Sequence, residues 1–460
     1  MAELSTEYRD LLARLRTIFA SGRSRPLAWR RAQLDAMQKM LEDNEDAIAE
    51  ALAGDLSKPR QEVLLGETSL IFGEIRHARA RMERWARPRR VDTPAVAQPG
   101  SSFVQPEPLG VVLIIGAWNY PIQLVLAPLV AAIAAGNCAV IKPSEVTPRA
   151  SKLLAELVPN YLDPDAIAVV EGAVPETTAL LQQRWDHIFY TGGAVVGKIV
   201  MKAAAEHLTP VTLELGGKSP AIIDDSADLK SAARRIAWGK TLNAGQTCIA
   251  PDYVLVSAKQ KPALIEALKQ SLRDMLGPDP LASSDYAAIV NDRHFERLRA
   301  LLAQGTPAIG GQSDPSTRKI APTVLTDVQL DAEVMTDEIF GPILPIIEVD
   351  NLDLAISFVR RGDKPLAAYL FTRSSASEKK FLAELACGSV AINDVMMFMS
   401  VPELPFGGVG MSGMGSYHGQ AGFDRFSHLK AVIRRARFPE IPIRFAPYSA
   451  FKIKLLKWFA

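Results

Sequence analysis

Short, unbroken runs of apolar residues that alternate with helical stretches are the strongest constraint on the fold of this chain. A strand buried on both faces of a parallel sheet is apolar along its whole length, and a parallel neighbour is reached through a crossover, usually a helix. Four such runs follow one another, at residues 111–115, 139–141, 168–170 and 187–190. They predict an α/β fold with a doubly wound parallel sheet covered by helices on both faces.

A second series of the same kind begins after Glu214. Its strands are expected near residues 221–223, 253–256, 344–347 and 367–370. A chain of 460 residues is longer than one hydrophobic core usually supports, so we expect a second α/β domain.

Two further segments have recognisable patterns. Apolar residues recur at helical spacing between residues 27 and 53, which predicts an amphipathic helix. A stretch rich in proline and small residues follows Arg90, and it predicts a protruding hairpin.

The composition narrows the class of protein. Acidic and basic residues nearly balance at a formal charge of +1, so no overall positive field would attract nucleic acid. The three cysteines, Cys138, Cys248 and Cys387, form no disulfide pattern, which indicates a reducing compartment. The first residues lack the apolar segment of a secretory signal, and no apolar run reaches the roughly 20 residues of a membrane span. We expect a soluble cytoplasmic protein that does not bind nucleic acid.

One cysteine lies in a polar turn, where its sulfur could react with a substrate. Cys248 ends the sequence Gly245-Gln246-Thr247-Cys248, and we expect its thiol to be partly ionised near neutral pH. Glu214 ends an apolar stretch just before Gly216 and Gly217, so its carboxylate is a candidate base. Capping of the two glycine amides is the alternative role for this glutamate.

Glu214 and Cys248 lie 34 positions apart, and this spacing is similar to that of the aldehyde dehydrogenase superfamily. The chain resembles that superfamily over nearly its whole length. The shared motifs occur in the family's order: Ala117-Trp118-Asn119-Tyr120-Pro121, Ile141-Lys142-Pro143-Ser144-Glu145, Phe189-Tyr190-Thr191-Gly192-Gly193, Glu338-Ile339-Phe340-Gly341-Pro342 and Leu404-Pro405-Phe406-Gly407-Gly408-Val409-Gly410. The short N-terminus, Ala250-Pro251-Asp252-Tyr253 and residues 413–419 resemble the class 3 branch. That resemblance implies medium-chain, fatty or aromatic aldehydes as substrates.

The resemblance also implies a covalent mechanism. Cys248 would attack the aldehyde carbon to form a thiohemiacetal, which is oxidised to a thioester and then hydrolysed. The charge that develops on the aldehyde oxygen needs hydrogen-bond donors already in place. Asn119, with the main-chain N–H of Cys248, is the expected donor, and an Asx turn before Pro121 is its alternative role. Glu214 is expected to take a proton from the attacking water.

The coenzyme is expected at the strand ends of the first domain, although the Gly-x-Gly-x-x-Gly fingerprint is absent. Thr191, Gly192 and Gly197 lie at a strand-to-helix junction, where glycines would let a pyrophosphate approach the helix N-terminus. A plain tight turn is the alternative there. The resemblance places Lys142 and Glu145 at the adenosine ribose hydroxyls. A 2′-phosphate would be repelled by the glutamate and attracted by the lysine, so NAD is favoured and NADP is the alternative.

Two more residues, Glu338 and Phe340, are implied by the resemblance at the nicotinamide ribose. The substrate channel is expected to be apolar and aromatic, although ordinary core packing is the alternative for each residue. Its predicted lining is Tyr120, Trp238, Leu242 and Phe406. The apolar run at residues 395–399 indicates bulky hydrophobic substrates. No metal site is expected, and histidines such as His294 look like surface or helix residues.

By resemblance, the hairpin and the C-terminal chain form a third element through which subunits pair, as a homodimer. We expect a dinucleotide-binding domain over residues 1–90 and 108–213 and a catalytic domain over residues 214–408. A small β oligomerisation element is expected over residues 91–107 and 409–460.

The tail after Ala446 carries lysines among apolar residues. If it is helical, it gathers an apolar stripe on one side, made of Phe451, Leu455, Trp458 and Phe459. This stripe would pack on protein, or it would lie on an anionic membrane surface as a peripheral contact.

Two other functions are compatible with these residues. In a thiol-dependent esterase or acyltransferase, Cys248 and Glu214 would work without redox chemistry. A binding protein that kept the fold would have no need of either residue, and both are present.

Overall fold

The computed structural model describes residues 2–437 and 442–459. Its first sheet has the strand order β17-β7-β6-β3-β4-β5, and β17 is its antiparallel edge. The strands are β3 (Val111–Ile115), β4 (Cys138–Lys142), β5 (Ile167–Val169), β6 (His187–Thr191), β7 (Val211–Glu214) and β17 (Gly413–Met414). The four apolar runs therefore form β3 to β6 of a parallel sheet, as predicted.

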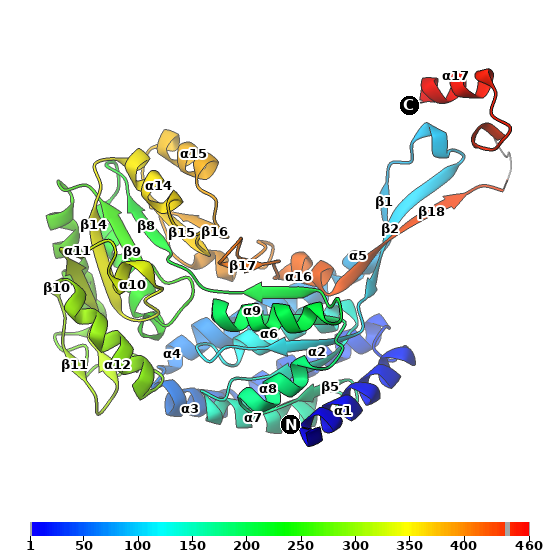
Figure 1. The fold of residues 1–460 in the computed structure, drawn as a ribbon. Helices are drawn as coiled ribbons and strands as arrows, with labels where there is room; N and C mark the ends of the chain where they lie inside the picture. The colour runs from blue at the N-terminus through cyan, green and yellow to red at the C-terminus, as the bar shows by residue number, and fades with distance from the viewer. Residues whose placement is uncertain (1, 438–441, 460) are drawn as a thin grey trace.

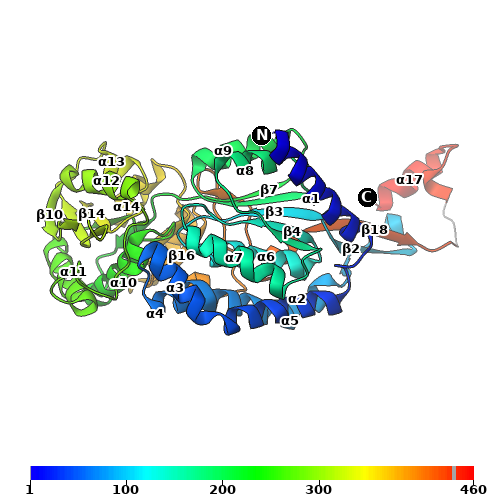
Figure 2. The same ribbon diagram turned by 90° about the horizontal axis from the view of Figure 1, so that it is seen from below.

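Helices cover both faces of this sheet (Figure 2). They are α1 (Ala2–Ala20), α2 (Leu27–Asp43), α3 (Glu45–Leu56), α4 (Arg60–Val63), α5 (Ser69–Ala86), α6 (Gln123–Ala135), α7 (Pro148–Tyr161), α8 (Val174–Leu181), α9 (Ala194–Ala205) and α16 (Gly419–Arg425). The region expected as one amphipathic helix is divided at Asn44 into α2 and α3.

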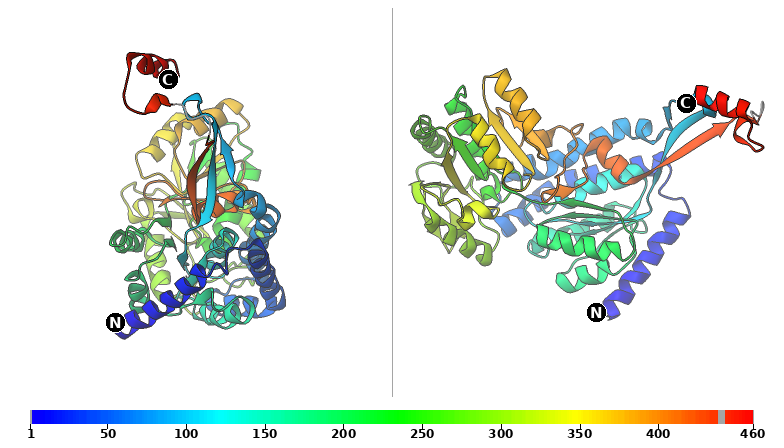
Figure 3. Two further views of the ribbon diagram at one scale, coloured as in Figure 1. Left: turned by 90° about the vertical axis from the view of Figure 1, so that its right-hand side faces the viewer. Right: turned by 45° about the horizontal axis from the view of Figure 1, so that its top comes forward.

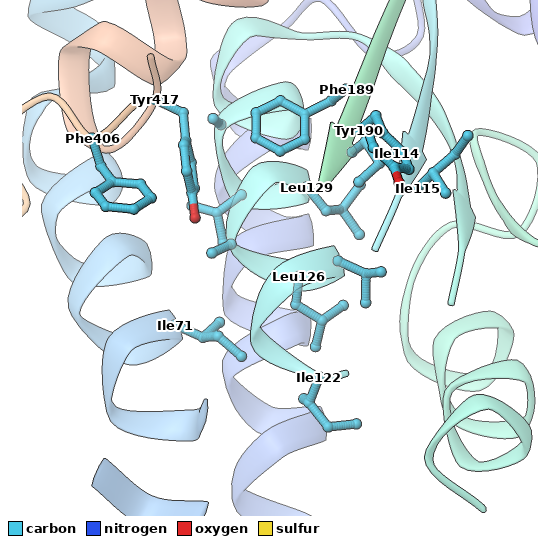
Figure 4. Close-up of a cluster of buried hydrophobic side chains, with 14 of the residues drawn as sticks. Ile71, Ile114, Ile115, Ile122, Leu126, Leu129, Phe189, Tyr190, Phe406 and Tyr417 are labelled. Carbon is cyan, nitrogen blue, oxygen red and sulfur yellow. The ribbon is translucent and has the colours of Figure 1, made fainter. Parts of the chain in front are cut away.

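The core of the first domain is built around α6. All of its residues are buried, as expected for a helix that is apolar on every side. Figure 4 shows Leu126 and Leu129 of this helix between Ile71 of α5 and the strands β3 and β6. This packing holds the start of α6 and the loop before it in place.

The second sheet has the strand order β10-β13-β14-β9-β8-β15-β16. Its strands are β8 (Pro220–Ile223), β9 (Tyr253–Val256), β10 (Thr306–Ile309), β13 (Thr323–Thr326), β14 (Ile343–Glu348), β15 (Ala367–Phe371) and β16 (Ser389–Ile392). Its helices are α10 (Leu229–Thr241), α11 (Lys261–Leu276), α12 (Asp292–Leu301), α13 (Glu333–Thr336), α14 (Leu352–Arg360) and α15 (Ser375–Glu384). A small hairpin, β11 (Ser313–Asp314) with β12 (Lys319–Ile320), is attached to this domain. The two sheets form separate lobes in Figure 1, joined by the chain that runs from β7 to β8.

A third sheet projects from the first domain as an arm (Figures 1 and 3). It consists of β1 (Arg89–Val91), β2 (Gly100–Pro108) and β18 (Ser427–Arg435), with β2 in the middle. The predicted hairpin is therefore present. At the tip lies α17 (Ala450–Phe459). Of the helices in the described part of the chain, none is long and apolar enough to cross a membrane.

The chain joins the arm later than the boundary predicted at residue 409. Residues 413–425 belong to the first domain, because β17 pairs with β7 and α16 packs against α5 and α6. The glycines of this segment allow close approach to β7. A Cβ at Gly413 would lie 2.5 Å from the Leu213 carbonyl oxygen.

Candidate active site

A cavity of about 340 Å³ lies at the seam between the two large domains. The carboxyl ends of β6 and β7 face it from one side, and the loop after α10 faces it from the other. It brings together most of the predicted site residues: Asn119, Tyr120, Thr191, Gly192, Glu214, Trp238, Leu242, Cys248, Glu338, Phe340 and Phe406.

The loop that carries Cys248 has an unusual backbone. Asn243, Ala244 and Gly245 all have positive φ, of 50°, 52° and 71°. A Cβ at Gly245 would lie 2.4 Å from the Gly341 carbonyl oxygen, so only glycine fits at this position. This left-handed turn ends α10 and leads to Cys248, whose side chain is partly exposed to the cavity.

Asn119 lies in the loop between β3 and α6. Its side-chain amide Nδ2 donates to the Gln246 carbonyl oxygen at 3.0 Å. Because an amide nitrogen carries two hydrogens, the second hydrogen is left for a group in the cavity. The side chain therefore reaches across the seam to the Cys248 loop, and the Asx turn considered from the sequence is not what holds it.

Tyr120 reaches the same loop. Its hydroxyl lies 2.8 Å from Thr247 Oγ1, next to Cys248. The Cys248 loop is thus bonded to two successive residues of the first domain.

Glu214 ends β7, where it pairs in register with Thr191 of β6. It is buried, and neither carboxylate oxygen has a hydrogen-bond partner among the described residues. Burial raises the pKa of this carboxyl well above its usual range, since water no longer stabilises its charge. Glu214 does not cap the glycine amides, because the Gly217 N–H donates to Glu338 instead. An unpartnered, desolvated carboxylate is a strong base.

The state of the Cys248 thiol differs from the prediction of partial ionisation near neutral pH. Burial raises its pKa above the usual range, and the negative charges of Glu338 and Glu214 raise it further. The expectation of partial ionisation is therefore wrong. The thiol is neutral at pH 7 and must transfer its proton when it attacks.

Glu338 is the second buried carboxyl of the cavity. Its pKa is raised to about 8, chiefly by burial and then by the charge of Asp252. Gly216 makes room for it, since a Cβ there would lie 2.0 Å from Glu338 Oε2. The backbone after Glu214 thus lies directly against this carboxylate.

The predicted coenzyme residues follow the carboxyl edge of the first sheet. Thr191 Oγ1 is buried with no hydrogen-bond partner in the described part of the chain, and it faces the cavity. Gly193 precedes α9, and a Cβ there would meet nothing within 4 Å, so the N-terminus of this helix is open to a ligand. Gly197 lies outside the cavity, where it lets α9 approach Leu215 closely.

Lys142, the last residue of β4, and Glu145, three residues later, also lie outside the cavity. They form an ion pair with 3.0 Å between Lys142 Nζ and Glu145 Oε2. Parallel strands of an open sheet bind nucleotides at their carboxyl ends, where all of these groups lie. The residues present therefore fit a nicotinamide dinucleotide.

Several residues of the cavity were not predicted from the sequence. His294 is on a helix, α12, as expected, but it also lines the cavity, and its ring centroid lies 5.2 Å from that of the tilted Trp118 ring. Arg297, one turn further along α12, donates to the Ile339 carbonyl oxygen at 2.6 Å. No motif marks either residue, because α12 reaches the cavity only through the fold of the second domain.

The apolar wall of the cavity is wider than the four predicted residues. Phe406 lies beside Tyr417, as Figure 4 shows. The two ring centroids are 5.9 Å apart, and the rings are nearly perpendicular. Other apolar residues complete the wall: Leu65, Leu70, Leu124, Met396, Met397 and Met399. Three methionines of the 395–399 run therefore face the cavity, as its composition suggested.

Known proteins share this sequence and this architecture. The family model described as "Aldehyde dehydrogenase family" matches residues 5–432. "Aldehyde dehydrogenase family 3 member A2" of Mus musculus is 50% identical over 448 residues, which cover 97% of this chain and 93% of the mouse protein. "Aldehyde dehydrogenase, dimeric NADP-preferring" of Rattus norvegicus is 47% identical, with 95% of this chain and 98% of the rat protein covered.

A solved structure of Staphylococcus aureus AldH, described as its substrate-bound state, has a TM-score of 0.95 and 42% identity to this chain. The match covers 98% of this chain and 99% of the bacterial one. The chain belongs to the aldehyde dehydrogenase family, among relatives of family 3, and is an NAD(P)-dependent aldehyde dehydrogenase.

Proposed function

We propose that this dehydrogenase oxidises a hydrophobic aldehyde to its carboxylic acid through a covalent bond to Cys248, with Asn119 and Glu214 as its partners. The observation that carries the proposal is their convergence on one cavity. A thiol, a half-free amide donor and an unpartnered carboxylate all line it. These are the nucleophile, the oxyanion donor and the base that a thioester route needs.

The reaction begins with the neutral thiol. Cys248 Sγ bonds to the aldehyde carbon, and its proton passes to the ionised form of the Glu338 carboxyl, whose pKa is raised to about 8. Glu214 stays available as the base of the later hydrolysis. The free N–H of Asn119 and the main-chain N–H of Cys248 hold the negatively charged oxygen. A bound nicotinamide dinucleotide supplies the two-electron oxidation that converts this thiohemiacetal to a thioester. Glu214 then takes a proton from water, whose oxygen attacks the thioester, and the acid leaves as the sulfur is released.

The aldehyde class follows from the wall of the cavity. Trp238, Leu242, Phe406 and the methionines offer apolar contact with few polar groups, so aliphatic chains and aromatic rings are favoured over small polar aldehydes. Methionine side chains are flexible, and they accept ligands of different shape.

For the coenzyme, we infer NAD as the preferred form, with NADP also used. Glu145 would repel a 2′-phosphate, while Lys142 would attract it. The ion pair between them leaves the lysine partly neutralised. The rat relative, 47% identical to this chain, is named as NADP-preferring, which supports the use of NADP as well.

We also infer that the arm pairs two copies of the chain. Apolar side chains are exposed along it, including Val91, Leu429 and Ile433. A rat relative is named as dimeric.

The tail is a candidate for peripheral contact with an anionic membrane. Tyr448, Phe451 and Ile453 are exposed there. The side chains of Trp458 and Phe459, which complete the predicted stripe, lie outside the described residues.

The proposed reaction is tested with a panel of aliphatic and aromatic aldehydes, each assayed with NAD and with NADP. We expect kcat/KM to rise with the apolar surface of the aldehyde. We expect Cys248→Ala to abolish both aldehyde oxidation and ester hydrolysis, while cofactor binding stays near normal. Ester hydrolysis without redox turnover of any aldehyde would favour the esterase or acyltransferase alternative. Turnover by the alanine variant would refute the covalent route.

A further inference from the structure

A buried ion pair lies directly beneath the loop that carries Asn119. Between α4 and α5 the chain forms a π-helical turn, η1 (Leu64–Thr68), which directs Glu67 inward. There its carboxylate Oε1 lies 2.7 Å from Lys58 Nζ, and both side chains are 0% exposed. Buried charges are costly, and π-helical turns occur often at functional sites, so this pair needs an explanation.

The partners of the pair supply the explanation. Lys58 Nζ donates to the Asn119 carbonyl oxygen at 2.9 Å. Glu67 Oε2 accepts from the main-chain N–H groups of Ile122 and Gln123, at 3.1 and 2.9 Å. The pair therefore holds both ends of the turn that carries the proposed oxyanion donor.

The same ammonium group also contacts the next residue. Lys58 Nζ lies 4.2 Å from the centroid of the Tyr120 ring, whose hydroxyl is bonded to Thr247 beside Cys248. Gly66 of the π-helical turn lies against this ring, because a Cβ there would be 2.8 Å from Tyr120 Cε1. One turn of chain thus supports both residues that touch the Cys248 loop.

We propose that Lys58 and Glu67 are positioning residues for the oxidation step, which act by holding Asn119 so that its free amide hydrogen faces the reacting oxygen. This inference rests on the proposed role of Asn119. An oxyanion donor is effective only where it is held in advance, and a shift of about 1 Å can cost 10²-fold in rate. The ion pair resists such a shift because the backbone of the turn is bonded to both charges.

The test uses the double variant K58M/E67Q in the full-length enzyme. Methionine keeps the length of lysine without its charge, and glutamine keeps an acceptor for the two main-chain amides, so no unpaired charge is left. Stopped-flow absorbance measures the formation of NADH in the first turnover. Its rate constant reports the reaction in active molecules, and its amplitude counts them. We expect the rate constant to fall roughly 10- to 100-fold, with amplitude and NAD affinity preserved.

The matched control is Asp163→Asn. Asp163 is also buried and paired, with Arg23 Nε at 2.9 Å, but it lies among α1, α2 and the residues before β5. Removal of the Asp163 charge should leave the rate constant of the first turnover unchanged.

A mutant cycle with Asn119→Ala separates positioning from stability. If the pair acts through Asn119, K58M/E67Q has no further effect on the rate constant in the N119A background. The inference is overturned if the double variant lowers only the amplitude, or if it slows N119A as much as it slows the wild type. If N119A itself reacts at the normal rate, the proposed role of Asn119 fails, and this inference fails with it.

If the double variant does not fold, E67Q alone carries the same cycle. It keeps the contact of Lys58 with Asn119, and it should slow the first turnover by a few-fold in the wild type only. Equal slowing in both backgrounds would overturn the inference.

Discussion

The side-chain nitrogen of Asn119 lies 3.0 Å from the main-chain oxygen of Gln246, two residues before Cys248. This bond joins a loop of the first domain to a loop of the second. The position of the donor is therefore set relative to the nucleophile itself. Tyr120 and Thr247 are bonded beside it, so two residues of the first domain hold the Cys248 loop in place.

Replacing Glu214 by Gln should separate oxidation from hydrolysis. The amide has nearly the same shape but cannot take a proton from water, whereas formation of the thioester does not need it. We expect a pre-steady-state burst of NADH followed by slow steady-state turnover. The measurement is stopped-flow absorbance with excess aldehyde. Absence of the burst would mean that Glu214 acts earlier, as the acceptor of the Cys248 proton.

Replacing Glu338 by Gln should make Cys248 more reactive in alkaline solution. Burial raises the pKa of the thiol first, and the charge of Glu338 adds to it once this carboxyl ionises, near pH 8. Removing a negative charge lowers the pKa of a neighbouring thiol. We therefore expect the pH profile of iodoacetamide alkylation to shift to lower pH, with alkylation at pH 9 faster by roughly threefold to tenfold. Glu348→Gln, at an exposed glutamate paired with Lys261, is the control. An unchanged profile would show that burial alone sets the thiol pKa.

The stability of the protein should depend on the titration of Glu74. Burial raises its pKa from 4.5 to about 7. His418 Nδ1, 3.8 Å from Glu74 Oε1, does not compensate the charge, because burial lowers its own pKa to about 4. The folded state thus binds the proton of Glu74 more tightly than the unfolded chain does. The protonated Glu74 therefore stabilises the folded state. This stabilisation is fully present below pH 4.5 and is lost as the pH rises through 7.

Glu74→Gln has no such titration and keeps an acceptor for the Gly419 N–H. Between pH 4.5 and 8, we expect the free energy of unfolding of the variant to rise relative to that of the wild type by up to about 3 kcal/mol. Urea unfolding at several pH values measures this difference. The exposed Glu83→Gln serves as control. A constant difference across this range would contradict the prediction.

Removal of the tail after Ala446 tests its contact with lipid. The full chain should co-sediment with anionic vesicles at low salt, because lysines near an anionic surface each contribute about 1 kcal/mol, and the truncated chain should not. Neutral vesicles are the control for the charge. Equal binding by both chains, or no binding by either, would leave the tail as a packing element. Within the described residues, Lys452 Nζ already donates to the carbonyl oxygens of Phe445 and Pro447, so part of the lysine charge serves the fold of the tail.

The sheets and most of the cavity could be predicted from the sequence, because they depend on local patterns. Continuous apolar runs identify parallel strands, and the ends of such strands meet at one edge of a sheet. For this reason Thr191 and Glu214, 23 positions apart, were expected in one site and are neighbours in register. The motif around Cys248 marked the second side of the cavity.

Other features depend on contacts between distant segments, for which the sequence has no local signal. His294 and Arg297 face the cavity only because α12 packs at its rim. Lys58 and Glu67 carry no signal of burial in the sequence: Lys58 lies in the loop between α3 and α4, and the π-helical turn directs Glu67 inward to meet it. The thiol pKa was mispredicted for the same reason, since the burial and the two nearby carboxylates come from three separate parts of the chain.

The left-handed turn before Cys248 has a consequence for the history of such enzymes. Gly245 lies against Gly341, and the Cys248 loop is bonded to Asn119 and Tyr120, so the position of the reactive sulfur is set by both lobes. A lobe transplanted onto an unrelated partner would carry a fold and a binding surface, but no turnover. Recombination that exchanges one lobe therefore preserves activity only when these contacts between the lobes are kept. For this chemistry, the two lobes are inherited together.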